Sequence, residues 1–170
     1  MDKIWAPWRV PYITKVVKSK ESKVSVFSKV LKENKDKKNL IFMRRERTFA
    51  ILNLYPYNNG HSLILPNRQV SELEELTAEE RVEIFDTLLE VKALLKKTIN
   101  PQGFNVGVNL GRVAGAGMPE HLHMHVVPRW GGDMNFMPVV GQTKVISQSL
   151  SALYDLLIKT QKKPRNKLKK

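Results

Sequence analysis

The chain has no cysteine, and this absence excludes two kinds of structure at once. Neither a disulfide framework nor a thiolate metal site can form without a thiol. No apolar run approaches the roughly 18 residues of a membrane-spanning helix, so we expect no contact with a membrane. The first five residues, Met-Asp-Lys-Ile-Trp, lack the hydrophobic region of a signal peptide. These absences together predict a cytoplasmic protein.

Acidic residues are also scarce, with 16 against 29 lysines and arginines, and the net charge is +13. Such an excess attracts nucleotides, nucleic acids or acidic membranes. It is concentrated in residues 15–38, which have nine lysines and three acids, and in residues 162–170, which have six cations and no acid. Aromatic side chains that would stack on bases are not interleaved with these charges. The pattern therefore favours a solvated basic face and tail over nucleic-acid binding.

The length of 170 residues and the apolar share of 42% suit one domain with its own core. We predict a single domain over residues 1–161 and a basic C-terminal tail over residues 162–170. Residues 1–13 are too apolar for a free terminus, so we expect this arm to be ordered against the domain or a partner subunit. Residues 15–38 are predicted to form a loop and a short basic helix.

Strand-like apolar runs occur in five places along the chain. Three of them, at residues 39–43, 48–54 and 61–65, can form an antiparallel meander, because the Tyr-Pro-Tyr-Asn-Asn-Gly stretch between the last two is typical of a turn. Alternating patterns predict two more strands at residues 104–110 and 121–127. Strands grouped around one long helix indicate an α+β fold with a mostly antiparallel sheet of about five strands.

The long helix begins at Thr77, because Thr77 and Glu80 have the spacing of a capping box. Asn100-Pro101 ends it. Apolar residues recur within it at roughly the helical period, at Val82, Phe85, Leu88, Leu89, Leu95 and Ile99. A final helix is predicted over residues 147–160, with its inward face formed by Leu150, Leu153, Leu157 and Ile158.

Histidine is rare, yet three of the four histidines, His121, His123 and His125, alternate within one predicted strand. Alternation places all three imidazoles on one side of that strand and leaves Leu122, Met124 and Val126 for the core. The fourth, His61, opens another predicted strand. Three histidines in register can be metal ligands, a nucleophile with supporting donors, or structural side chains.

The segment before these histidines, Gly-Arg-Val-Ala-Gly-Ala-Gly at residues 111–117, is rich in glycine. Glycines allow backbone N–H groups to surround an anion. Next to three imidazoles and an excess of positive charge, the loop indicates a phosphate ligand. It favours the nucleophile over the metal site.

These residues resemble the histidine-triad (HIT) superfamily. Residues 121–127, His-Leu-His-Met-His-Val-Val, match its His-φ-His-φ-His-φ-φ pattern at every place. Asn53 followed by Gly60-His61 is similar to its nucleoside-binding hairpin, and Asn109-Leu110-Gly111 to its phosphate-contacting segment. The resemblance implies a HIT-like fold and a homodimer in which two subunits join their sheets and helices.

Within that superfamily the chain looks like the bacterial diadenosine tetraphosphate phosphorylases, or ATP adenylyltransferases. The resemblance covers roughly residues 3–160. It rests on the stretches Trp-Ala-Pro-Trp-Arg from residue 5, Leu-Asn-Leu-Tyr-Pro-Tyr-Asn-Asn-Gly-His from residue 52, and Val-Pro-Arg-Trp-Gly-Gly-Asp from residue 127.

Two departures from the family are visible. Many relatives bind zinc through a Cys-x-x-Cys near the N-terminus and a His after the third strand. Ser25, Ser28 and Arg68 stand at the matching positions here, so we expect no metal site. Relatives often have Ser or Gln where this chain has Gly117, so a backbone N–H would replace a side-chain donor to the phosphate.

The resemblance implies nucleotidyl transfer through the middle histidine, His123. Its imidazole would attack the α-phosphorus, expel the polyphosphate and leave a nucleotidyl-histidine, which water or inorganic phosphate then resolves. His125 and His61 would donate to phosphate oxygens, and His121 would orient its neighbours through a backbone hydrogen bond. No cofactor is implied, although Mg²⁺ can accompany the nucleotide.

The resemblance also implies a substrate-binding set around these histidines. Asn53 would bind ribose hydroxyls, and Arg129 and Trp130 would reach the second nucleotide. The phosphate would be held by Asn109 and by the N–H groups of Gly115, Ala116 and Gly117.

Three other hypotheses stay open beside cleavage of dinucleoside polyphosphates. The same nucleophile could serve a nucleoside phosphoramidate or adenylyl hydrolase. The basic tail and face could belong to a nucleic-acid-associated deadenylating protein, whose binding would fall steeply with salt. The histidines could instead hold the metal of a hydrolase, which a chelator would inactivate.

Overall fold

The computed structural model describes residues 24–134, 140–141 and 145–163 of the chain. Within them, five strands form one antiparallel sheet in the order β1-β2-β3-β5-β4. The strands are β1 (Ile41–Arg44), β2 (Thr48–Leu52), β3 (Ser62–Pro66), β4 (Gly103–Val108) and β5 (Met124–Arg129). The prediction of an α+β fold with about five antiparallel strands is confirmed.

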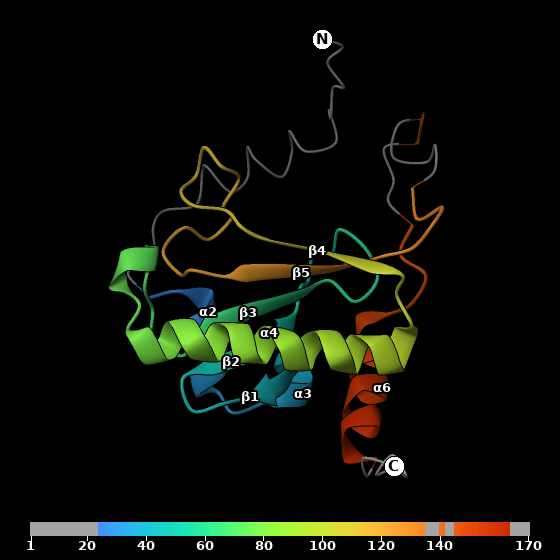
Figure 1. Ribbon diagram of the computed structural model, residues 1–170, viewed down its shortest axis with the longest axis horizontal. Helices are drawn as coiled ribbons and strands as arrows, with labels where there is room; N and C mark the ends of the chain where they lie inside the picture. The colour runs from blue at the N-terminus through green and yellow to red at the C-terminus, as the bar shows by residue number, and fades with distance from the viewer. Residues whose placement is uncertain (1–23, 135–139, 142–144, 164–170) are drawn as a thin grey trace, which may run out of the picture.

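One long helix, α4 (Ala78–Ile99), lies across the sheet and contacts β2, β3 and β5 (Figure 1). The predicted capping box is present, since Thr77 accepts from the Glu80 N–H and the Glu80 carboxylate accepts from the Thr77 N–H. At the other end Asn100 adopts a left-handed conformation (φ 46°), which ends the helix before Pro101.

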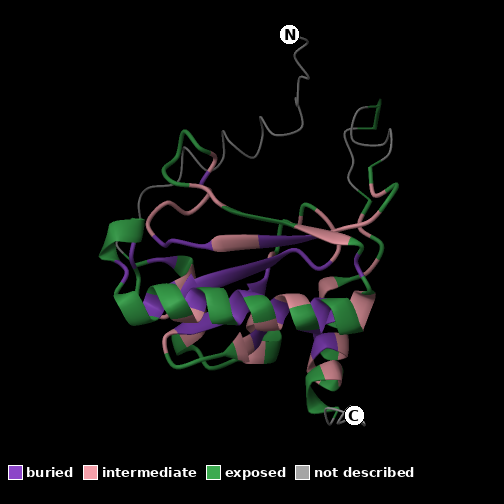
Figure 2. Cartoon of the chain, in the orientation of Figure 1, coloured by how far each residue is buried: buried purple, intermediate pink, exposed green. Residues whose placement is uncertain are grey.

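The apolar residues of α4 divide between two faces. Leu88 and Leu95 are buried, in line with Ile84 and Val91, and together they cover the sheet. Figure 2 shows buried and exposed bands alternating along this helix. The apolar residues predicted to recur along this helix also included three that are more than 60% exposed: Val82, Phe85 and Leu89. A helix with apolar residues on two faces does not reveal from sequence which face meets the core.

Shorter helices complete the domain: α2 (Val26–Lys32), α3 (Asp36–Asn39), the 3₁₀ turn η2 (Leu73–Glu75) and α6 (Leu150–Lys162). The helix α6 is capped by Ser149, later than the predicted start at residue 147, and it packs on α4 and β1. Its predicted inward face is confirmed, because Leu153 and Leu157 are fully buried and Leu150 and Ile158 pack against the core.

The centre of the core is formed by β2 and β3, every residue of which is buried (Figure 2). No helix among the described residues is long and apolar enough to cross a membrane. The predicted N-terminal arm, residues 1–13, and residues 164–170 of the predicted tail lie outside the described residues. The division into a domain at 1–161 and a tail at 162–170 therefore stays a prediction.

Candidate active site

The histidines lie where β5 begins and where β3 begins. The strand predicted over residues 121–127 starts later, at Met124, so of the three alternating histidines only His125 belongs to it. The reason lies in the register, because Met124 to Val126 pair with Ser62 to Ile64 in β3. Residues 121–123 run past that pairing, and Leu122 N–H donates to the carbonyl of Val70 instead, at 2.7 Å. The strand bounds predicted at residues 121–127 were therefore wrong, and strand alternation does not account for the positions of His121 and His123.

Tertiary contacts nevertheless bring the histidines together on the face of the sheet away from α4. The ring centroids of His123 and His125 are 5.0 Å apart, and those of His61 and His125 are 5.1 Å apart. His61, His121 and His123 are at most 7% exposed. Phe27 of α2 contacts the rings of His121 and His123, so one wall of the site comes from the segment before the sheet.

The proton positions of His61 and His125 follow from backbone geometry. The Tyr57 N–H points at Nδ1 of His61 at 2.9 Å, so that nitrogen must accept and Nε2 carries the proton in the neutral ring. His61 Nε2 then donates to Nδ1 of His125, 2.9 Å away. In neutral His125 the proton therefore sits on Nε2. That nitrogen is buried and has no hydrogen-bond partner among the described residues.

The ring of His123 is oriented the opposite way. Its Nδ1 lies 2.8 Å from the carbonyl oxygen of His121, which can only accept, so Nδ1 carries the proton and Nε2 keeps its lone pair. Burial lowers the pKa of His123 and therefore keeps that lone pair available. The pKa of His125 falls to about 4 because of burial and the repulsion of His123. The site thus holds an unprotonated nitrogen beside a ring that presents an N–H.

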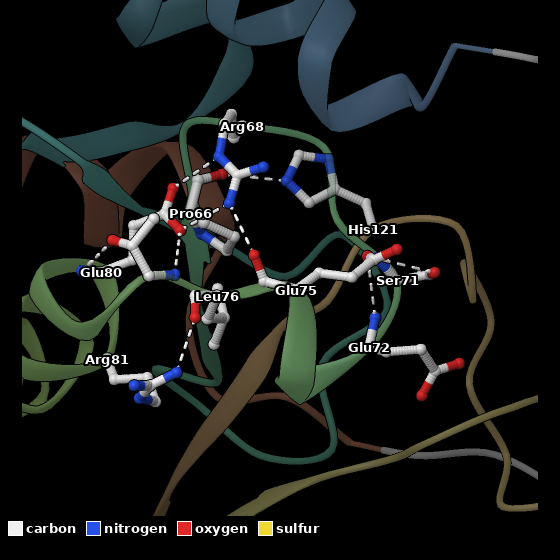
Figure 3. A network of polar contacts seen from close by, with 10 residues as sticks. Pro66, Arg68, Ser71, Glu72, Glu75, Leu76, Glu80, Arg81 and His121 are labelled. Carbon is white, nitrogen blue, oxygen red and sulfur yellow. Dashed lines mark hydrogen bonds and ion pairs between the residues drawn. The ribbon is translucent and has the colours of Figure 1, made fainter.

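His121 is anchored rather than open to the site. Its Nε2 donates to the carbonyl oxygen of Pro66 at 2.9 Å, and burial lowers the pKa of its ring (Figure 3). Its ring is thus bonded to the last residue of β3, while its own carbonyl accepts from His123. The orienting role expected for His121 stays a prediction.

The glycine-rich loop follows β4 and is folded on itself. Gly111 and Gly115 have positive φ angles of 75° and 92°, which glycine adopts without strain. Asn109 Nδ2 donates to the Gly115 carbonyl at 3.4 Å and so closes the loop. The N–H groups of Gly115 and Ala116 donate to the carbonyls of Arg112 and Gly111. Both N–H groups thus bond within the loop in this structure, and a role of Gly115, Ala116 and Gly117 in holding phosphate stays a prediction.

Asn53 supports the histidine pair through the hairpin between β2 and β3. Its Oδ1 accepts from the Tyr55 N–H at 3.0 Å, and its Nδ2 lies 3.3 Å from Nδ1 of His61. Tyr57 lies in the same turn, and its ring is stacked on that of His125 with an interplanar angle of 9°. Sequence reasoning missed Tyr57 as a site residue, although it stands in the stretch that resembles the family.

Arg129 and Trp130 lie at the far end of β5, where their polar groups form hydrogen bonds with other residues of this chain. The Arg129 guanidinium makes a bidentate ion pair with Asp133, at 2.6 and 2.8 Å, and also donates to Asn105. This pairing lowers the pKa of Asp133 to about 2. Trp130 Nε1 donates to the carbonyl of Asn100. A role of either residue in binding the second nucleotide stays a prediction.

Comparison with known proteins decides the family. Residues 34–132 match the HIT domain, which covers more than half of the chain. The chain belongs to the HIT family. It is 43% identical over 155 residues to AP-4-A phosphorylase of Mycobacterium tuberculosis, covering 88% of this chain and 79% of that protein. It is 33% identical over 95 residues to the asymmetrical bis(5'-nucleosyl)-tetraphosphatase of Schizosaccharomyces pombe, covering 56% and 52%.

Solved HIT structures share this fold. A Zn-bound histidine triad family protein from Mycobacterium smegmatis superposes with a TM-score of 0.66 at 20% identity, covering 80% of this chain and 91% of that one. A HIT family protein from Bacillus anthracis superposes with a TM-score of 0.58 at 27% identity, covering 66% and 78%. The HIT-like fold expected from the resemblance is confirmed.

The zinc implied by the first of these structures does not fit this HIT protein. No group of three or more His, Asp or Glu side chains in the described parts of the chain could hold a metal ion. The guanidinium of Arg68, which was matched to a zinc-ligand position, is bound to other groups: it pairs with Glu80 at 2.8 Å and donates to the Glu75 carbonyl (Figure 3). The side chain that meets Ser25 and Ser28 is Gln69. Sequence matching missed it by one position.

Proposed function

We propose that this HIT protein cleaves dinucleoside polyphosphates, diadenosine tetraphosphate among them, by nucleotidyl transfer through His123. The proposal is carried by the two opposed rings, since His123 Nε2 has a lone pair and His125 Nε2 has a proton to donate. A neutral nucleophile can approach a polyanion without charge repulsion. The names of its relatives, AP-4-A phosphorylase and bis(5'-nucleosyl)-tetraphosphatase, support this substrate class.

In the proposed first step, Nε2 of His123 forms a bond to the α-phosphorus while the bond from that phosphorus to the polyphosphate oxygen breaks. The leaving polyphosphate takes up the negative charge, and the Nε2–H of His125 donates to a phosphate oxygen. In the second step, water or inorganic phosphate attacks the same phosphorus while its bond to His123 breaks. His123 leaves as a neutral ring, and the proton lost by an attacking water passes to the solvent. Asn109 and Gly117 N–H would hold the phosphate, and Asn53 the ribose.

The first prediction is that diadenosine tetraphosphate is consumed and that the products depend on the acceptor. With inorganic phosphate a phosphorylase releases ADP and ATP, whereas a hydrolase releases AMP and ATP. The measurement is product analysis by chromatography with and without phosphate. We expect the phosphorolytic products, because the relative with the higher identity is named a phosphorylase.

The control for this experiment is His123→Asn, which keeps a polar side chain at the buried position but removes the nucleophile. Turnover is expected to vanish while the circular dichroism spectrum and melting temperature stay close to those of the wild type. Activity retained by the purified variant would contradict the assignment of His123. Full activity in the presence of a chelator is expected as well, since the described residues supply no metal ligand set.

A homodimer forms the second part of the proposal, and its support is an uncovered apolar surface. Val82, Phe85 and Leu89 follow one face of α4 at spacings of three and four residues and are exposed. An apolar hollow of about 110 Å³, to which Phe85 of α4 and Val108 of β4 contribute, connects this face to β4. Strand β4 ends the sheet among the described residues. Exposed apolar patches and open strand edges are the features that a second subunit covers.

We also propose that the protein works in the cytoplasm and that its basic residues attract the substrate. A substrate with several phosphate groups would be attracted by the excess of positive charge, which explains the basic character without invoking nucleic acid.

A further inference from the structure

A polar cluster behind the triad is composed of three buried residues, Ser25, Ser28 and His121, and of the exposed residue Gln69. The two serines come from the start of α2, Gln69 from the chain after β3, and His121 from the segment before β5. Ser25 and His121 are fully buried, and Ser28 is 8% exposed. Polar groups at such depth destabilise the fold unless they bond to one another. The cluster therefore joins three segments that are distant in the sequence.

The cluster forms one continuous hydrogen-bonded chain. Gln69 Oε1 accepts from the Ser25 backbone N–H at 2.8 Å and from Ser28 Oγ at 3.4 Å. Ser28 Oγ also lies 3.5 Å from Nδ1 of His121. Because Nε2 of His121 donates to the Pro66 carbonyl, Nδ1 of the neutral ring is the acceptor and the Ser28 hydroxyl is the donor. The hydroxyl is thus shared between Gln69 Oε1 and His121 Nδ1.

The donors of this cluster suit hydrogen bonding and do not suit a metal. Two neutral hydroxyls, one amide oxygen and one imidazole include only one group of the kind that binds zinc in proteins, with no second imidazole, thiolate or carboxylate beside it. The positions that relatives of this family use for zinc therefore have another task in this chain.

We infer that Ser28 and Gln69 are positioning residues for the proposed nucleotidyl transfer, acting on His123 through His121. They hold the His121 ring between α2 and the chain after β3. The His121 carbonyl is thereby fixed at 2.8 Å from Nδ1 of His123, which keeps the lone pair of His123 on Nε2. The same bonds hold α2 in place, so that Phe27 covers the rings of His121 and His123.

The test is Ser28→Ala, with Ser28→Thr as the conservative variant that restores the hydroxyl. Loss of one hydrogen bond, about 1 kcal/mol, corresponds to roughly a fivefold change. We expect kcat with diadenosine tetraphosphate to fall about fivefold at unchanged KM, and Ser28→Thr to recover it. Ser149→Ala, which removes the cap of α6, is the matched control, because it weakens the fold without touching the triad.

The second measurement is independent of turnover, which matters because the inference rests on the proposed function. Nitrogen-15 spectra of the four histidines report which ring nitrogen carries a proton. In the wild type we expect His121 protonated on Nε2 and His123 on Nδ1. In Ser28→Ala we expect the His121 signals to move and His123 to populate both tautomers.

The inference is overturned if Ser28→Ala has wild-type histidine spectra, or if its kcat falls no further than that of Ser149→Ala. It is also overturned if Zn²⁺ alone binds the wild-type protein at one equivalent and shifts the His121 signals. If the spectra change as expected while no dinucleoside polyphosphate is cleaved, the positioning role stands and the proposed function fails.

Discussion

Backbone groups decide which ring nitrogen carries the proton in His61, His121 and His123, and His61 in turn decides it for His125. The Tyr57 N–H makes Nδ1 of His61 an acceptor. The His121 carbonyl makes Nδ1 of His123 a donor, and the Pro66 carbonyl makes Nε2 of His121 a donor. Backbone donors and acceptors cannot change their sign with pH, so the tautomers stay fixed while the rings are neutral. The difference between nucleophile and donor, two residues apart in the sequence, results from these contacts.

The stability of the protein should fall on acidification because of His125. Burial and His123 hold the pKa of His125 near 4, below its value of roughly 6.5 in an unfolded chain. As the pH falls, the unfolded state therefore takes up the His125 proton at a higher pH than the folded state does. The contribution of His125 to the free energy of unfolding is fully present above pH 6.5 and is lost as the pH falls from 6.5 towards 4. Urea denaturation at pH 7.5, 6.0 and 5.0 measures this dependence.

The variant for comparison is His125→Gln, which is neutral throughout this range. Its free energy of unfolding should depend less on pH than that of the wild type, by up to about 1.4 kcal/mol per pH unit. Equal pH dependence in the two proteins would show that His125 is not held neutral by its surroundings.

At the scale of elements, the hairpin between β2 and β3 and the end of α4 are packed to fit one another. Gly60 lies in the last turn of this hairpin with a φ of 77° and precedes His61 directly. A Cβ atom there would lie 2.6 Å from Cδ1 of Ile99 in α4 and 3.1 Å from Cγ of Pro128 in β5. The position of His61 thus depends on contact among a turn, a helix end and a strand.

Gly60→Ala is expected to destabilise the fold by roughly 1–3 kcal/mol and to lower kcat, because the Cβ displaces the turn that holds His61. Urea denaturation and steady-state kinetics measure the two effects. Gly103→Ala at the start of β4 is the matched control, since a Cβ there meets no atom within 4 Å and the backbone does not need a glycine. If the two variants behave alike, the close packing at Gly60 has no consequence for the site.

At the scale of the whole molecule, the two faces of the sheet carry different groups. One side presents the histidines under Phe27 and Tyr57. The other is covered by α4, whose outer apolar face, with Val82, Phe85 and Leu89, remains exposed beside the edge strand β4. Catalysis and the proposed association of subunits therefore use separate surfaces.

Phe85→Glu should convert the proposed dimer into a monomer, because a carboxylate in the apolar interface would lose its hydration without gaining a partner. Light scattering coupled to size exclusion measures the mass. Val145→Glu is the control, since Val145 is equally exposed, at 60% against 61%, but belongs to neither α4 nor β4. A wild-type protein that elutes as a monomer at high concentration would refute the dimer.

Sequence alone determined the class of fold, the ends of α4, the four histidines and the family. These features depend on local chemistry: a capping box and a left-handed asparagine act within one turn, and the His-φ-His-φ-His-φ-φ spacing identifies the chemistry without reference to the fold. Only the tertiary structure decided that β5 begins at Met124, that Gln69 rather than Arg68 meets the serines, and which of the two apolar faces of α4 meets the core. Each of these depends on the register between β3 and β5 or on packing between distant segments, which no local pattern encodes.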